Sequence, residues 1–269
     1  MYALDFEYDG QYLSDFGFIV CNFNASSGKT TATAGSKITF NTVSRHRGNR
    51  YSLTGTQYNE CIQSKFGICK NPDQYDDLEI TNDEYRDLMR WLNRNKFLRF
   101  QVLSDAEGRD ACFYDASFNI EKVLVAEKLY GLELTMETNR PFGYGAEQRT
   151  RLNFSDVNKK QSVMDLSDDI GTLFPNLHIT CKADGNLQII NETFPCVLVI
   201  QNCKNGEEID INGDTLIITS SRDDHEICND FNFEFLKIGN TMDNRSNKIS
   251  VSLPCILDIT YSPIIKDAP

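Results

Sequence analysis

Short stretches in which apolar and polar residues alternate dominate the second half of the chain. The clearest are residues 177–181, 231–235 and 249–253, which read Leu-His-Ile-Thr-Cys, Phe-Asn-Phe-Glu-Phe and Ile-Ser-Val-Ser-Leu. Because successive side chains of a strand point to opposite faces, this pattern predicts strands with one buried and one solvated face. We therefore expect an antiparallel β-sandwich with Phe231, Phe233 and Phe235 facing inward. Such an architecture carries no chemistry by itself.

A hairpin is expected where Asn212 and Gly213 separate residues 207–211 from residues 214–219. The Asn-Gly pair tolerates the two positive φ angles of a tight two-residue turn better than other dipeptides. The spacing thus predicts that the chain reverses directly at this pair.

The first half contains one clear helix signal among further strand-like stretches. Thr81 and Glu84 have the spacing of a capping box, in which each side chain accepts a hydrogen bond from the backbone amide of the other residue. An apolar stripe at helical spacing follows: Tyr85, Leu88, Met89 and Leu92, with Trp91 at its edge. Before the helix, residues 3–17 have the pattern of strand, turn and strand, with the turn at Asp9-Gly10.

Residues 139–145 interrupt the strand pattern with one proline and two glycines. Turn residues of this kind mark a break between periodic segments, and 269 residues are comfortable for two domains of ordinary size. We therefore expect a mainly β protein with an N-terminal β-domain that carries one helix, residues 1–142, and a C-terminal antiparallel sandwich, residues 143–269.

The acidic balance of the chain limits its partners. Asp and Glu number 39 against 27 Lys and Arg, so the formal net charge is −12. Nucleic-acid binders need clustered cations to displace counterions, so we expect no specific nucleic-acid partner. No run approaches the ~20 apolar residues of a membrane span, and the first residues lack the pattern of a secretory signal. We therefore expect no membrane partner.

The nine cysteines do not suggest a disulfide framework, because their number is odd and no C-x-x-C pair occurs. Cys181, Cys196, Cys203 and Cys255 lie in or beside apolar strand runs, where cysteine serves as a small hydrophobic residue. We expect reduced thiols in a protein that folds in a bacterial-type cytoplasm.

Two groups of residues invite a metal interpretation. Glu208, Asp210 and Asn212 have the spacing that opens a calcium loop, but Thr219 stands where that loop needs a bidentate Glu. On the strand interpretation, these three side chains share one solvated face. We expect no calcium site.

The histidines and nearby cysteines form a nominal zinc set, His178 with Cys181 and His225 with Cys228. Residues three apart on a strand point to opposite faces, so His178 and Cys181 cannot both bind one ion without a bulge. His225 lies in an acidic stretch that we expect to be a solvated turn. With three histidines and no catalytic motif, the sequence predicts no metal, no cofactor and no catalytic residue.

A basic segment, residues 45–50, opposes the overall charge of the chain. It contains Arg45, Arg47 and Arg50 and follows an alternating stretch over residues 38–43. It is either a solvated loop tip or an arm that reaches an acidic neighbour, steered by complementary charge. In the second interpretation, these three arginines lie in a contact between subunits.

The order of these features resembles the distal tail protein family of long-tailed, non-contractile phages, and the likeness spans nearly the whole chain. The segments that carry it are Tyr8-Asp9-Gly10 with Asp15-Phe16-Gly17, the helix over residues 88–92 and the strand after it, Arg140-Pro141-Phe142-Gly143-Tyr144, Asn191, the hairpin at Glu208-Ile209-Asp210-Ile211-Asn212-Gly213, and the ending over residues 247–261 with Ile259-Thr260-Tyr261-Ser262-Pro263. Their order and spacing together are more specific than any one of them.

The resemblance implies a structural virion protein and no enzyme. Family members have an N-terminal domain related to tail-tube subunits, with a projecting arm or belt, and a C-terminal galectin-like sandwich. They form a homohexameric ring at the virion tail tip. This ring joins the tail-tube protein to the tail-associated tip protein and holds receptor-binding proteins. The present chain has no room for the inserted carbohydrate-binding module of longer relatives.

Two other functions stay open on the residues alone. A lectin-like, carbohydrate-binding sandwich would carry aromatic side chains on a concave face, to stack on sugar rings. A tail-tube subunit would form long polymers and usually has one domain. A secreted glycosidase would also need a signal segment, which the chain does not show.

Overall fold

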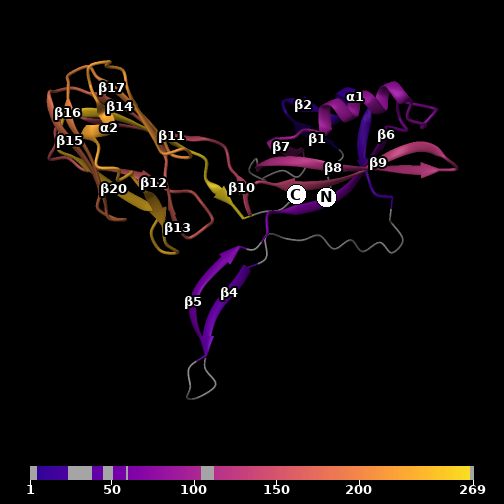
Figure 1. Ribbon diagram of the computed structural model, residues 1–269, viewed down its shortest axis with the longest axis horizontal. Coiled ribbons are helices and arrows are strands. Elements are labelled where there is room, and N and C mark those ends of the chain that lie inside the picture. The colour runs from indigo at the N-terminus through magenta and orange to yellow at the C-terminus, as the bar shows by residue number, and fades with distance from the viewer. Residues whose placement is uncertain (1–4, 24–37, 45–50, 59, 104–111, 267–269) are drawn as a thin grey trace. The chain divides into compact units, whose positions relative to one another are not determined.

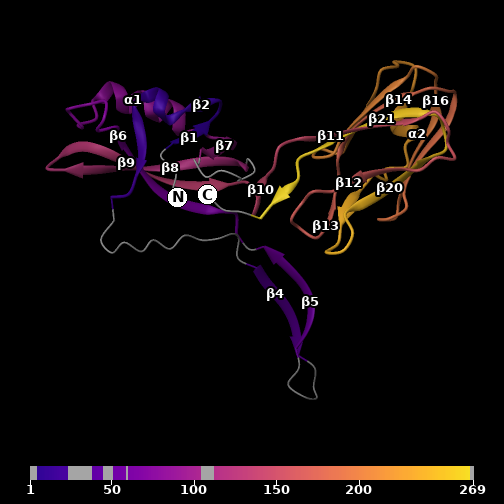
Figure 2. The same cartoon turned by 180° about the vertical axis from the view of Figure 1, so that it is seen from behind.

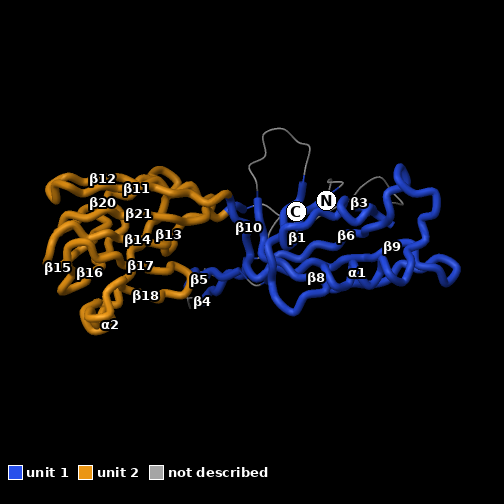
Figure 3. The backbone as a smooth tube through the Cα atoms, turned by 90° about the horizontal axis from the view of Figure 1, so that it is seen from above, with its two compact units in different colours: residues 1–145, 265–269 blue, residues 146–264 orange. Residues whose placement is uncertain are grey.

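The computed structural model describes residues 5–23, 38–44, 51–58, 60–103 and 112–266. The chain divides into two compact units, one formed by residues 1–145 with 265–269 and the other by residues 146–264 (Figure 3). Antiparallel strands build both units and helices are few, which confirms the expected mainly β fold of two antiparallel-sheet domains.

Unit 1 contains, among the described residues, a nine-stranded sheet (Figure 1). Its main path runs β2-β1-β7-β8-β9-β6-β3, with β10 and β22 off this path. The strands are β1 (Asp5–Tyr8), β2 (Gln11–Tyr12), β3 (Phe18–Cys21), β6 (Gln63–Lys70), β7 (Leu98–Leu103), β8 (Phe113–Val125), β9 (Lys128–Thr138), β10 (Gly143–Tyr144) and β22 (Ile264–Ile265). Strands β1 and β2 join through Asp9 and Gly10, whose φ angles of 53° and 76° fit the turn predicted there.

Helix α1 (Asn82–Leu92) begins where the capping box predicts. Thr81 Oγ1 accepts a hydrogen bond from the Glu84 amide at 3.3 Å, and Glu84 Oε2 accepts one from the Thr81 amide at 2.7 Å. The other helical segments described are η1 (Leu13–Phe16) and α2 (Ile227–Asp230). None of the described helices combines the length and the apolarity that a membrane crossing requires.

Trp91 packs α1 against the sheet. The sequence places it at the edge of the apolar stripe, but its side chain is buried and stacks on Phe6 and Phe16, with ring centroids 5.6 and 4.5 Å apart. Its indole Nε1 donates to the carbonyl oxygen of Tyr8 at 2.9 Å, so the polar atom is satisfied as well. The core of unit 1 is therefore aromatic where the helix meets β1.

Unit 2 contains a five-stranded and a four-stranded antiparallel sheet in the described residues (Figure 2). The first has the order β11-β21-β14-β17-β18 and the second β12-β20-β15-β16, while β13 pairs with β19. The strands are β11 (Gln148–Phe154), β12 (Gln161–Met164), β13 (Gly171–Leu173), β14 (Asn176–Cys181), β15 (Gly185–Asn191), β16 (Cys196–Cys203), β17 (Glu208–Asn212), β18 (Ile217–Ser220), β19 (Ile238–Asn240), β20 (Ser246–Val251) and β21 (Cys255–Tyr261).

The apolar halves of these alternating strands form one core, as their pattern predicts. Ile179 of β14 lies in register between Ile209 of β17 and Leu257 of β21, and all three are buried. Strands of the four-stranded sheet add further apolar side chains to the same core, among them Leu187 and Leu198. Four cysteines that the sequence places in apolar runs are also buried: Cys181, Cys196, Cys203 and Cys255.

The β17–β18 hairpin is confirmed, but the predicted two-residue turn is wrong. Strand β17 ends at Asn212 and β18 begins at Ile217, and the positive φ falls on Leu216, at 55°. Asn212 instead accepts hydrogen bonds at its side-chain oxygen from the amides of Asp214 and Thr215, at 3.0 and 2.8 Å. An Asx turn therefore replaces the expected two-residue turn.

Residues 231–235 do not form a strand, and the expectation that three phenylalanines face inward is wrong for Phe233. Phe231 is buried and forms an isolated bridge with Ile200, and Phe235 packs against the core. Phe233 has a φ of 55° and is 65% exposed. A left-handed residue interrupts the pleat, so alternation in the sequence does not become alternation in space.

Side chains from this segment cover the free edge of β16. Asn232 Oδ1 accepts from the Val199 amide at 3.0 Å, and Asn232 Nδ2 donates to the Val197 carbonyl at 2.8 Å. Glu234 Oε2 accepts from the Val197 amide at 3.3 Å. These side chains occupy the backbone groups through which another strand would pair, so the edge of this sheet is protected.

Candidate assembly interface

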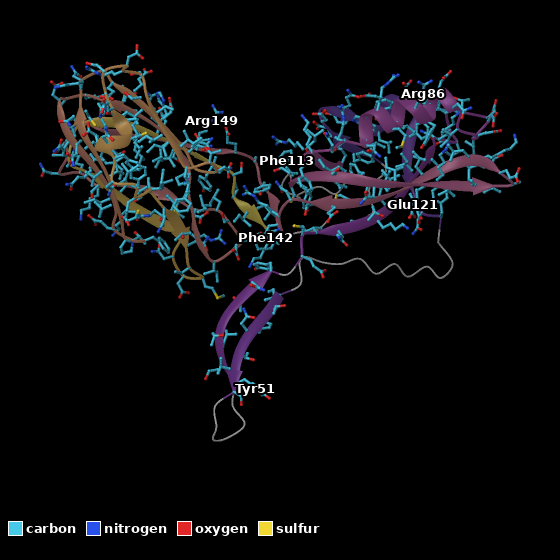
Figure 4. The ribbon with its side chains drawn as sticks, viewed as in Figure 1. Tyr51, Arg86, Phe113, Glu121, Phe142 and Arg149 are labelled. Atoms are coloured by element: carbon cyan, nitrogen blue, oxygen red, sulfur yellow. The ribbon has the colours of Figure 1, made fainter. Side chains whose placement is uncertain are left out.

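Strands β4 (Ile38–Ser44) and β5 (Tyr51–Tyr58) form a separate two-stranded sheet in unit 1, which we call the arm. In the part of the chain that the structure describes, they pair with each other and with no other strand. Figure 4 shows Phe142 near one end of the arm and Tyr51 at the opposite end. A lone two-stranded hairpin is marginally stable in water, so packing against another surface would stabilise the arm.

The register gives the arm one apolar and one mainly polar face. Paired residues of antiparallel strands point to the same face, and the pairs alternate between faces. The face that we call apolar carries five large apolar or aromatic side chains, Ile38, Phe40, Tyr51, Leu53 and Tyr58, together with the smaller Thr42, Ser44 and Thr56. The other face carries Thr39, Asn41, Val43, Ser52, Gly55 and Gln57. Phe40 is 62% exposed and Tyr51 is 73% exposed.

A β-bulge creates this separation. Asn41 pairs with Gly55 and Thr42 pairs with Leu53, so Thr54 is an extra residue in β5. Thr54 Oγ1 donates to the Asn41 carbonyl oxygen at 2.9 Å, which holds the bulge. If Thr54 instead paired with Thr42 in a regular ladder, Leu53 and Tyr51 would point away from Phe40, because a one-residue slip moves each side chain to the other face.

The base of the arm contacts the body of unit 1. The rings of Tyr58 and Phe142 meet edge to face, with centroids 4.6 Å apart. Lys266 Nζ lies 5.6 Å from the centroid of the same Phe142 ring. Phe142 belongs to the Arg-Pro-Phe-Gly-Tyr segment of the sequence, so this segment supports the attachment of the arm.

The arginines that the sequence offers as interface residues, Arg45, Arg47 and Arg50, lie outside the described residues. They fall in the segment that connects β4 to β5, whose flanking residues Ser44 and Tyr51 are paired. The apolar face is the part of the candidate interface that sequence reasoning missed. Its signal was the alternation of Ile38 and Phe40.

The described residues hold no group of three or more metal-ligating side chains. His178 and Cys181 point to opposite faces of β14, since Cys181 is buried while His178 reaches the outer face and bonds Asp210 at 2.7 Å. Glu208, Asp210 and Asn212 are exposed and alternate with buried residues along β17, as the shared solvated face predicts. The structure therefore gives the calcium and zinc interpretations no geometric support in these residues.

His225 does not lie in the solvated turn that the sequence predicts, because its side chain is only 4% exposed. Its Nδ1 lies 2.5 Å from Glu207 Oε1 and its Nε2 lies 3.3 Å from Asp230 Oδ2. Burial works to lower the pKa of His225, but the hydrogen bond and charge of Glu207 outweigh it, so the pKa is raised. Burial works to raise the pKa of Glu207, but hydrogen bonds from His225 and Ser220 outweigh it, so that pKa is lowered. The pair is an internal ion pair of the sandwich.

A cavity of about 240 Å³ lies where α1 ends, in unit 1. Its lining includes Arg94, Lys96, Phe97, Ser117 and Glu137. The Ser117 hydroxyl donates to the Arg94 carbonyl oxygen at 2.9 Å, so it is engaged with the backbone rather than with a base. The groups of this cavity do not form a nucleophile–base pair.

Comparisons with known proteins relate the chain to phage tail proteins. The family model described as "Phage tail protein N-terminal domain" matches residues 1–140, and "Phage tail C-terminal domain" matches residues 142–261. A search of curated proteins finds no match. Among solved structures, the chain is similar to the Dit protein of phage SPP1, with a TM-score of 0.66 and 13% identity over 96% of this chain and 98% of that one.

SPP1 Dit is described as a paradigm of the hub adsorption apparatus in Gram-positive infecting phages. The similarity extends over both units, which confirms the predicted resemblance to distal tail proteins at the level of the fold. Together the two family models span nearly the whole sequence, and the N-terminal one alone covers more than half of it. The chain therefore belongs to the family of phage tail proteins that carry these two domains.

Proposed function

We propose that the chain is the structural subunit of a hexameric hub at the distal end of a long, non-contractile phage tail. The ring joins the tail-tube protein to the tail-associated tip protein and holds receptor-binding proteins. The subunit has no enzymatic activity, is made in the bacterial host cytoplasm and resides at the virion tail tip. The N-terminal domain closes the ring and the C-terminal sandwich is galectin-like.

The observation that carries this proposal is the apolar face of the arm. Ile38, Phe40 and Leu53 are exposed on it, in a two-stranded sheet with no other strand beside it in the described residues. Burying apolar surface contributes about 25 cal/mol per Å², so such a face gains stability against a partner. A ring of identical subunits needs one patch that meets a different patch of the next copy, and a projecting arm supplies one such patch.

The test of the hub is the mass of the assembly. Size-exclusion chromatography with light scattering should give six times the chain mass of 30.6 kDa. Negative-stain images should show single rings, whereas long polymers would favour a tail-tube subunit. A monomer at all concentrations would overturn the proposal.

A variant of the arm tests the interface itself. Phe40→Asp with Leu53→Asp places two charges on the apolar face and should abolish the ring, because a buried unpaired charge costs several kcal/mol. The matched control is Asn41→Asp with Gln57→Glu, which adds the same charge to the opposite face. The control should assemble like the parent, and equal behaviour of both variants would contradict the assigned face.

The exposed ring of Phe233 favours a second candidate, a carbohydrate-binding sandwich, because sugar rings stack on exposed aromatic side chains. A glycan array distinguishes the two functions. Glycan binding by the parent protein that is lost in Phe233→Ala would support a lectin-like role. No glycan binding by a protein that still forms rings would leave the hub as the remaining candidate.

A further inference from the structure

Strand β18 is an open edge of the five-stranded sheet. It pairs with β17, and no strand of the described residues lies on its other side. The Ser221 amide donates to the Glu208 carbonyl at 2.8 Å, toward β17. Because inward and outward amides alternate along an antiparallel strand, the backbone groups of Ile218 and Ser220 point outward.

Helix α2 lies beside β18. In the described part of the chain, however, no side chain bonds the outward backbone groups of β18 as Asn232 and Glu234 do at β16. Instead, Leu216 and Ile217 are 41% and 59% exposed beside it. Leu216 has a φ of 55°, a strained backbone region for a large side chain. An open, apolar edge of this kind favours pairing with another chain.

The surroundings of the edge are strongly acidic. Residues 207–226 contain seven carboxylates, of which all but Glu207 are exposed: Glu207, Glu208, Asp210, Asp214, Asp223, Asp224 and Glu226. Arg222 is the one Lys or Arg among them, so this stretch has a net charge of −6, half of the chain's −12. The edge therefore favours a partner strand that has apolar side chains along its length and basic side chains at its end.

The chain itself contains such a partner. The arm exposes apolar side chains along its strands, and the segment between them, residues 45–50, carries three arginines and no acid. We propose that the β17–β18 edge is the surface that receives the arm of a second copy. This proposal rests on the proposed hub and names the patch that the arm meets. Contact between two unlike patches is heterologous, as a ring requires.

Photo-cross-linking tests the pairing in the assembled protein. With Phe40→p-benzoylphenylalanine, the apolar face of the arm should cross-link between chains to residues 208–221, read out by mass spectrometry. The same group at Asn41, on the opposite face, should give at least about tenfold less of this product. Rings that form normally while Phe40 cross-links elsewhere, or within its own chain, overturn this inference and leave the hub intact. Failure to form rings in the parent protein would overturn the hub instead.

A charge exchange tests the electrostatic part of the contact between the arm and the β17–β18 edge. We expect three reversals on the edge, Glu208→Lys, Asp214→Lys and Asp223→Lys, to lower the salt concentration that dissociates the ring at least about twofold. Three further reversals in the same chain, Arg45→Glu, Arg47→Glu and Arg50→Glu, should return that salt concentration to the parent value.

The matched control reverses three exposed acids outside the stretch, Asp76→Lys, Glu127→Lys and Asp243→Lys. It should leave the salt dependence of the ring unchanged. Equal effects of both reversals, or no rescue by the exchange, would contradict the pairing.

Discussion

The backbone at Gly213 has no room for a side chain, because a Cβ would overlap the carbonyl oxygen of Phe174. The Gly213 amide also donates to Asn176 Oδ1 at 2.8 Å, so the turn is held against the start of β14. We predict that Gly213→Ala lowers the free energy of unfolding by about 1–3 kcal/mol. Thermal unfolding followed by circular dichroism measures the loss. Gly55→Ala is the control, since nothing lies within 4 Å of its Cβ, and an equal Tm for both variants would contradict the clash.

The internal ion pair of His225 and Glu207 makes the stability of the sandwich depend on pH. The raised pKa of His225 gives stability that is present below about pH 6.5 and is lost as pH rises through the folded-state value. The lowered pKa of Glu207 gives stability that is present above about pH 4.5 and is lost as pH falls through its folded-state value. Both contributions are therefore present between about pH 4.5 and 6.5.

His225→Gln should accordingly cost more at about pH 5.5 than at about pH 9. The expected loss at the lower pH is about 3 kcal/mol, because the change leaves Glu207 buried without its cationic partner. Amide exchange over residues 225–230 provides a local readout beside the Tm. A deficit of the same size at both pH values would show that the imidazole acts by packing alone.

At the scale of the element, the bulge decides which way the arm faces. Inserting one threonine between Asn41 and Thr42 would give Thr54 a partner in β4 and move Leu53 and Tyr51 to the polar face. We predict that this insertion variant folds with an unchanged circular dichroism spectrum but forms no ring, because the apolar face is divided. Deletion of Thr54 keeps Leu53 opposite Thr42, so the deletion variant should still assemble. A ring from the insertion variant would show that the face is not the interface.

Elements that local signals determine could be predicted from the sequence. The capping box of Thr81 and Glu84 fixed the start of α1, and Asp9-Gly10 fixed the first turn, since both depend on neighbouring residues only. The turn at Asn212 could not be predicted, because contacts with Asn176 and Phe174, far away in sequence, determine it. The same holds for Phe233, whose left-handed backbone lies between Asn232 and Glu234, the two residues whose side chains bond the edge of β16.

The candidate interface was accessible from the sequence only in part. Alternation over residues 38–43 and the arginines behind it pointed to an arm, but they gave no apolar face. That face depends on the register between β4 and β5, including an extra residue, and register is a property of two strands together. The arginines themselves remain a prediction.

At the scale of the whole molecule, charge is unevenly distributed, and the basic segment stands against an acidic total. We predict that Arg45→Glu, Arg47→Glu and Arg50→Glu together weaken assembly, since the arm would then have the same sign of charge as the acidic chain that it meets. Light scattering across a salt series measures the change, and salt should partly screen the repulsion. Rings of unchanged size and salt resistance would refute this role.

The side-chain amide of Asn232 makes the hydrogen bonds that a neighbouring strand would make to β16, one as acceptor and one as donor. Hydrolysis of that amide to a carboxylate during storage would keep the acceptor but turn the donor into a second anionic oxygen facing the Val197 carbonyl. The Val197 carbonyl would then lose its donor and face a negative charge, while the amides of Val197 and Val199 keep their acceptors. Deamidation at this one position therefore opens a single acceptor on the edge of β16 to an amide of another molecule, so aged protein should self-associate faster than fresh protein.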